Sequence, residues 1–125
     1  MPNTSLEILL VDDDASIRRA TGKVLKSLGY KNVYLAENGR EAFDSLKRRR
    51  VDLVLSDMNV PEMSGMELLR SIRNDEDLRD TRFIFISADE NPARIEVAFK
   101  AGADGYVFKP FEAEELHKTI LELFP

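Results

Sequence analysis

Short apolar runs and helical stretches alternate along the whole chain. The runs recur at intervals of roughly 25 residues and have the length and composition of strands; they span residues 6–11, 32–36, 53–56, 83–87 and 105–108. The first, third and fourth runs are almost continuously apolar, which is typical of strands covered on both faces. The alternation predicts an α/β fold, a doubly wound parallel sheet with right-handed crossovers, but it leaves the order of the strands open.

Apolar stripes with the period of a helix follow each of these runs. The stripes comprise Ile17, Thr21, Val24, Leu25 and Leu28; Ala42, Phe43 and Leu46; Met66, Leu69 and Ile72; Ile95, Ala98 and Phe99; and Leu116, Ile120, Leu123 and Phe124. Asn38 and Ser64 each precede a glutamate by three residues, which is the spacing of a capping box, and Asn91–Pro92 is a typical helix start. Gly29 and Gly102 are expected to end the first and fourth helices.

Length and composition fit a single globular domain over residues 1–125. A chain of this length buries roughly two-thirds of its unfolded surface, and the absence of cysteine excludes disulfides, thiolate metal sites and cysteine catalysis. The formal charge of −5 argues against direct binding of nucleic acid, which depends on neutralising phosphates. Neither a signal-peptide core nor a membrane-spanning stretch is present, so we expect a cytoplasmic protein without membrane insertion.

Polar side chains gather where the predicted strands end. Asp12–Asp14 follow the first strand, Asp57 the third, Ser87 the fourth and Lys109 the fifth. The second strand ends at Ala36–Glu37 and is interpreted as structural. Because ligands of such sheets bind outside the carboxyl ends of the strands, these side chains are the candidate site.

The chemistry of this candidate site is that of phosphoryl transfer. Two carboxylates ~4 Å apart repel by about 4 kcal/mol at an effective dielectric constant of ~20, so the cluster requires a cation. Oxygen ligands without His or Cys select a hard ion such as Mg²⁺, which neutralises phosphoryl charge, while a lysine and a hydroxyl add further contacts. Aspartate is an established phosphoryl acceptor, which makes transfer onto Asp the predicted reaction.

Several motifs resemble those of the receiver domains of two-component response regulators, and the resemblance covers essentially the whole chain. The motifs are Leu9–Asp14, Leu55–Gly65, Ile86–Ala88, Ala101–Tyr106 and Lys109–Phe111. The resemblance implies a flavodoxin-like (βα)5 fold with strand order 2-1-3-4-5 and a cis peptide bond before Pro110. Among such proteins, the chain resembles stand-alone receivers of the chemotaxis or phosphorelay type; a receiver fragment of a larger regulator or hybrid kinase is the alternative.

The resemblance also implies an acceptor and a metal site. Asp57 is the implied phosphoacceptor, and its donor is a sensor histidine kinase, a phosphotransfer protein or a small acyl phosphate. Asp12, Asp13 and Asp57 are implied Mg²⁺ ligands, together with the backbone carbonyl of Asn59. By this reading the chain is not an enzyme for an external substrate, because it promotes only its own phosphorylation and dephosphorylation.

The family's switch implies roles for further residues. Ser87, where the family more often has Thr, follows the arriving phosphoryl group; Lys109 pairs with the phosphoryl oxygens; and Tyr106 changes rotamer as Ser87 moves. The output is binding of a downstream target protein to the face formed by the fourth helix, the fifth strand and the fifth helix, and we expect a monomer. Asn59 and Asp89 occupy the positions that tune phosphoryl lifetime, and their polar side chains favour a short-lived switch.

Some residues have two interpretations. Asp14 is either a third acid beside the metal or the cap of the first helix. The run Lys47–Arg50 resembles a nucleic-acid patch, but at a helix C-terminus a solvated end is the better interpretation. His117, the single histidine, lies beside the last apolar stripe, which predicts a solvated surface residue and leaves phosphoryl donation to a partner.

Two other functions remain as alternatives. An Asp-x-Asp pattern after an apolar strand also occurs in haloacid-dehalogenase-like phosphatases, where Asp12 is the nucleophile and Asp14 the acid/base. That family needs another acidic motif after its lysine, and here Lys109 already follows the last strand. A pseudo-receiver, which binds partners without phosphorylation, is the other alternative, although the central residues are all retained.

Overall fold

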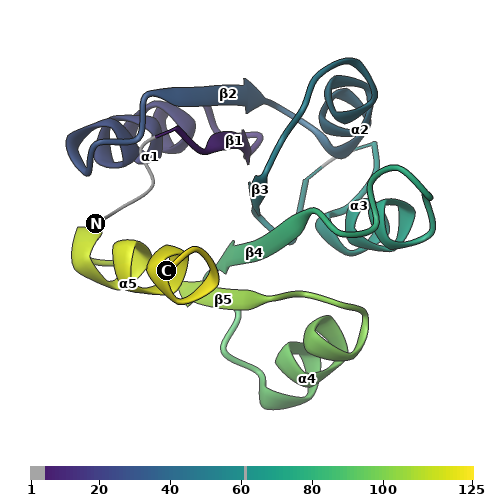
Figure 1. Ribbon diagram of the computed structural model, residues 1–125. Helices are drawn as coiled ribbons and strands as arrows, with labels where there is room; N and C mark the ends of the chain where they lie inside the picture. The colour runs from purple at the N-terminus through teal and green to yellow at the C-terminus, as the bar shows by residue number, and fades with distance from the viewer. Residues whose placement is uncertain (1–4, 61) are drawn as a thin grey trace.

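The chain forms a parallel sheet between two layers of helices (Figure 1). A computed structural model describes residues 5–60 and 62–125, so Pro61 of the predicted motif lies outside the described residues. The elements are β1 (Glu7–Val11), α1 (Ala15–Ser27), β2 (Asn32–Ala36), α2 (Gly39–Arg48), β3 (Leu53–Ser56), α3 (Gly65–Arg73), β4 (Arg82–Ser87), α4 (Pro92–Lys100), β5 (Gly105–Phe108) and α5 (Ala113–Leu123). The five strands lie in the order β2-β1-β3-β4-β5 and every neighbouring pair is parallel, which confirms the predicted fold and strand order.

Each central strand is buried on both faces, as its continuous apolar sequence predicts. Along β1, Ile8 and Leu10 pack in the cluster that includes Leu25 of α1, whereas Leu9 and Val11 pack in the cluster on the opposite face. Figure 1 shows α1 and α5 on one side of the sheet and α2, α3 and α4 on the other. Successive side chains of a strand point to opposite faces of the sheet, so each central strand contributes to two separate cores, one on each face.

Helix ends follow the predicted capping residues. The Ser64 side chain accepts a hydrogen bond from the N–H of Glu67, and the Glu67 side chain accepts one from the N–H of Ser64, which completes a capping box for α3. Asn38 caps α2 by accepting from the backbone N–H three residues on. Gly29 and Gly102 follow α1 and α4 with φ values of 100° and 112°, a region that glycine enters without strain.

The α4 helix differs from its predicted apolar stripe. Ala98 is fully buried, but Phe99 is 45% exposed and Ile95 only half-buried. Val97, outside the stripe, is 48% exposed. The physical reason lies in the position of α4 at the β5 edge of the sheet (Figure 1), where only a narrow strip of the helix meets other elements.

We expect Ser64→Ala to lower the free energy of unfolding by about 1 kcal/mol, because the first turn of α3 loses an acceptor for a backbone N–H. Urea unfolding followed by circular dichroism measures the change. Ser64→Asp is the matched control, since aspartate also caps helices and should retain most of the stability. Equal losses in the two variants would show that the cap contributes nothing here.

Candidate functional site

Three carboxylates meet at the carboxyl end of the sheet. Asp12 and Asp13 follow β1 and Asp57 follows β3, and these strands are neighbours. Each side chain offers an oxygen, and the three oxygens lie within 4.8 Å of one another. Asp12 is buried, Asp57 is half-buried and Asp13 is exposed, so the cluster opens to solvent on one side. The predicted convergence of these three residues is therefore present.

Lys109 joins the carboxylates from the end of β5. Its Nζ lies 2.8 Å from Oδ2 of Asp57 and 3.0 Å from Oδ2 of Asp12. Burial alone lowers the pKa of this ammonium, but the hydrogen bonds to Asp57 and Asp12 outweigh it, so the pKa of Lys109 is raised. The ammonium of Lys109 therefore stays positively charged and offsets part of the negative charge of the carboxylates.

The loop after β3 fixes the position of Asp57. The N–H of Asp57 donates to the carbonyl of Val11, and its Oδ1 accepts from the N–H of Asn59 at 3.1 Å. Gly65 lies so close that a Cβ placed there would be 2.5 Å from the carbonyl oxygen of Asp57 and 2.9 Å from the ring of Phe85. The sequence pattern includes Gly65, but only the folded loop explains why a side chain is excluded there.

Ser87 and Tyr106 converge on the backbone of Asp89. Ser87 is buried at the end of β4, and its Oγ accepts from the N–H of Asp89 at 3.1 Å. The Tyr106 hydroxyl donates to the carbonyl of Asp89 at 2.8 Å, and burial raises the pKa of this hydroxyl. The Tyr106 ring packs between Phe85 and Phe108, at centroid distances of 6.1 and 5.4 Å. One loop residue thus contacts both predicted switch side chains.

The Asp89 carboxylate is held at the start of α4. It accepts from the N–H of Asn91 at 2.9 Å and pairs with the guanidinium of Arg94 at 2.9 Å. These contacts, the Asn91 bond first, lower the pKa of Asp89. The sequence did not indicate a role for Arg94. Its ion pair with Asp89 joins residues five positions apart on either side of a helix start, and no known sequence motif marks such a pair.

Arg18 is a second residue that the sequence did not indicate. Its Nη1 donates to the backbone carbonyl of Asp12 at 2.7 Å, which ties α1 to the loop that holds the carboxylates. Asp14 serves as the cap of α1, accepting from the N–H groups of Ser16 and Ile17. It is not a member of the carboxylate cluster, so the cap interpretation of Asp14 is the one that holds.

Side chains of the basic run Lys47–Arg50, at the end of α2, contact neighbouring residues of the chain. Lys47 pairs with Asp75 at 2.8 Å, and Arg50 pairs with Asp52 at 2.9 Å. The guanidinium of Arg49 lies 4.0 Å from the centre of the Tyr34 ring. These contacts support the interpretation of the run as a helix end rather than a nucleic-acid patch.

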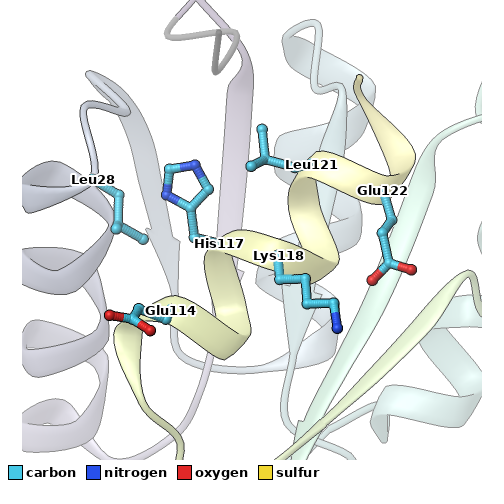
Figure 2. A pocket seen from close by; sticks show the side chains of 6 residues that line it. All are labelled: Leu28, Glu114, His117, Lys118, Leu121 and Glu122. Carbon is cyan, nitrogen blue, oxygen red and sulfur yellow. The ribbon is translucent and has the colours of Figure 1, made fainter.

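His117 lies at the surface, as predicted, but it is less solvated than the sequence suggested. Its ring is half-buried and lies 5.8 Å from the ring of Tyr30. Figure 2 shows it on α5 beside Leu28, in a shallow hollow of about 420 Å³. Because α5 packs alongside the end of α1, residues next to its apolar stripe also meet neighbouring side chains.

Outside the site, the described residues 5–60 and 62–125 include no helix that is long and apolar enough to span a membrane.

A cluster of acids joined by a lysine, at the carboxyl end of a sheet with order 2-1-3-4-5, defines the receiver class of phosphorylation switches in two-component signalling. The sequence model of the response regulator receiver domain matches residues 8–121, and the chain belongs to this family.

Similar proteins agree with this assignment. Chemotaxis protein CheY-3 of Vibrio cholerae is 37% identical over 122 residues, which cover 98% of this chain and 94% of that protein. The solved structure of chemotaxis response regulator CheY4 of the same species superposes with a TM-score of 0.83 at 31% identity, covering 97% of each chain. The receiver domain of sensor histidine kinase PA1611 from Pseudomonas aeruginosa, solved with a magnesium ion in its active-site cleft, has a TM-score of 0.85 at 33% identity and covers 94% of this chain and 96% of that one.

Proposed function

We propose that Asp57 accepts a phosphoryl group from the phosphohistidine of a sensor kinase or phosphotransfer protein, or from a small acyl phosphate. A carboxylate oxygen of Asp57 attacks phosphorus, the bond to the donor nitrogen or oxygen breaks, and the donor leaves with its electron pair. The observation that carries this proposal is the pairing of Asp57 with Lys109 beside two further carboxylates. In the product, the Lys109 ammonium pairs with oxygens of the new phosphoryl group.

The three acids fit Mg²⁺. All side-chain donors are carboxylate oxygens that lie within 4.8 Å of one another, and hard cations prefer such ligands. Asp12, Asp13 and Asp57 would hold the ion with the backbone carbonyl of Asn59. When bound, the ion would neutralise negative charge on the phosphoryl oxygens. The magnesium in the receiver domain of PA1611 supports this assignment by analogy.

A phosphatase with Asp12 as nucleophile fits the geometry less well. Asp12 is only 4% exposed, its Oδ1 accepts from the N–H of Asp14, and its Oδ2 accepts from Lys109. Asp14, the acid/base in that mechanism, is occupied as the cap of α1. We therefore propose that the chain acts on its own Asp57 and on no external substrate.

Phosphorylation is proposed to change the face formed by α4, β5 and α5. Ser87 and Tyr106 both contact the backbone of Asp89, so movement of Ser87 toward a phosphoryl group alters the contact that holds the tyrosine ring. Phe99 and Phe108 are exposed on α4 and β5 and offer an apolar surface to a downstream target protein.

Beryllofluoride, which mimics a phosphoryl group, tests this switch directly. With Mg²⁺, we expect changes in tyrosine fluorescence and in the amide shifts of α4, β5 and α5, whereas Asp57→Asn should not respond. A wild-type chain that binds beryllofluoride at Asp57 without these changes would contradict the switch. A chain that does not bind it at all would be a pseudo-receiver.

The lifetime of the phosphoryl group is a separate prediction. The Asn59 and Asp89 side chains are polar, and Asn59 is exposed beside the acceptor, so an attacking water can be held there. Replacing them together by Met and Leu should slow dephosphorylation on the order of tenfold, which corresponds to about 1.4 kcal/mol in the barrier. Loss of label from the purified phosphoprotein measures the rate, and an unchanged rate would contradict the prediction.

A further inference from the structure

One side of α1 is basic throughout. The helix carries Arg18, Arg19, Lys23 and Lys26 and no acidic residue, although the whole chain has a charge of −5. All four cationic residues line the same groove. Positive charge is therefore concentrated on one surface of an acidic protein, and this concentration favours an anionic partner.

The groove lies between α1 and β2, and we refer to it as the α1–β2 groove. It has a volume of about 220 Å³, and Gly22, Val33 and Leu35 line it together with the four cationic residues. β2 is an edge strand of the sheet, visible at the top of Figure 1, and Leu35 on it is 48% exposed. An exposed apolar side chain on an edge strand beside clustered charge is typical of a binding surface.

Gly22 is an independent sign of a partner. A glycine inside a helix costs about 1 kcal/mol relative to alanine. A Cβ at Gly22 would meet nothing within 4 Å, so packing within the described residues does not require glycine there. Gly22 is itself buried, so what the missing side chain leaves is unfilled space at the floor of the groove, which a partner's side chain can enter.

We infer that the α1–β2 groove docks an extended acidic segment of a partner protein. Its carboxylates pair with the cations of α1, an apolar side chain of the segment packs on Leu35, and its backbone extends the sheet beyond β2. A nucleic acid or a lipid headgroup offers no peptide backbone to pair with the edge of β2, which favours a protein segment as the occupant.

The lining of this groove includes none of the three carboxylates and not Lys109; Arg18, which donates to the carbonyl of Asp12, is the residue that connects it to the phosphorylation site. A second, larger hollow of about 510 Å³ lies on the other side of α1, where Ile17, Ala20 and Val24 face Lys109 and Phe111. The docked segment therefore leaves the acceptor accessible. The inference is independent of the proposed function, because it depends on neither Mg²⁺ nor phosphorylation.

The first test maps the docking surface. A short, end-blocked peptide of alternating glutamate and valine is titrated into the ¹⁵N-labelled full chain at low salt. We expect shift changes concentrated on the amides of Gly22, Val33 and Leu35, and weaker binding as salt rises. Shift changes centred elsewhere, or none, would overturn the inference.

The second test uses charge-matched variants. Lys23→Glu with Lys26→Glu should weaken peptide binding by about tenfold or more, whereas Lys100→Glu with Lys118→Glu, which changes the net charge equally, should have little effect. Gly22→Leu should also weaken binding by filling the groove, and thermal unfolding shows whether each variant is folded. If both charge pairs weaken binding equally, the attraction is diffuse and the inference fails.

Other occupants are outcomes of the same assay. Tighter binding of a single-stranded oligonucleotide or of anionic vesicles in the groove would overturn the assignment to an acidic protein segment. Dimerisation of the wild type that is lost in the Lys23→Glu, Lys26→Glu variant would instead identify a second copy of this chain as the occupant, and would overturn it too.

Discussion

Asp57→Asn is expected to abolish phosphorylation by acetyl phosphate in the presence of Mg²⁺. The amide has nearly the same shape as the carboxylate, but its uncharged oxygen is a poor nucleophile and a poor ligand for a hard cation. Lys109 keeps its contact with Asp12, so the fold of the site should survive the exchange. Intact-protein mass spectrometry measures the gain of one phosphoryl group in the wild type and its absence in the variant.

Asp14→Asn is the matched control for this experiment. It makes the same chemical change in the same acidic rim, but Asp14 only caps α1, and asparagine is as good a capping residue as aspartate. This variant should therefore be phosphorylated like the wild type. A phosphoryl group found on Asp12, or undiminished labelling of Asp57→Asn, would revive the phosphatase interpretation.

Removal of Mg²⁺ is expected to have the second large effect. Chelation with EDTA should prevent phosphorylation, because the clustered carboxylates then repel the incoming phosphoryl group with only Lys109 to offset them. An ion that binds only the folded chain stabilises it by about 2.7 kcal/mol at one hundred times its dissociation constant. Thermal or urea unfolding with and without the ion measures this stabilisation.

Asp13→Asn distinguishes specific binding from general salt effects. Asp13 is exposed and offers a carboxylate oxygen on the open side of the cluster. The substitution therefore removes one proposed Mg²⁺ ligand without disturbing the core. We expect the stabilisation by Mg²⁺ to fall sharply in this variant and to persist in Asp14→Asn. Equal stabilisation of both variants would show that the ion does not bind in the cluster.

The failures of sequence reasoning share a physical cause. The periodicity of α4 correctly predicted a helix that begins after Asn91, but it could not show that Phe99 is exposed, because exposure depends on how far the sheet extends beneath the helix. The partial burial of His117 was not predicted for the related reason that Leu28 and Tyr30 approach α5 from outside its apolar stripe. A pattern along one helix contains no information about what packs beside it.

Some residues of the site were predicted from the sequence and others were not, for a similar reason. Asp12 and Asp57 were found because strand ends of a parallel sheet must share one edge, which is a consequence of topology. Arg18 and Arg94 were not found, since each acts through a single contact, to the carbonyl of Asp12 and to the carboxylate of Asp89. Such contacts depend on the path of a loop and on a rotamer, and no spacing rule encodes them.

The sequence by itself determined the alternation of strands and helices, the burial of the central strands and the set of groups at the carboxyl ends. These follow from local periodicity and from the rule that parallel strands end together. Only the tertiary structure decided the separation of Asp14 from the carboxylate cluster, the convergence of Ser87 and Tyr106 on Asp89, and the exposure of the α1–β2 groove. Each of these depends on distances between segments far apart in the chain, which packing sets and local sequence does not.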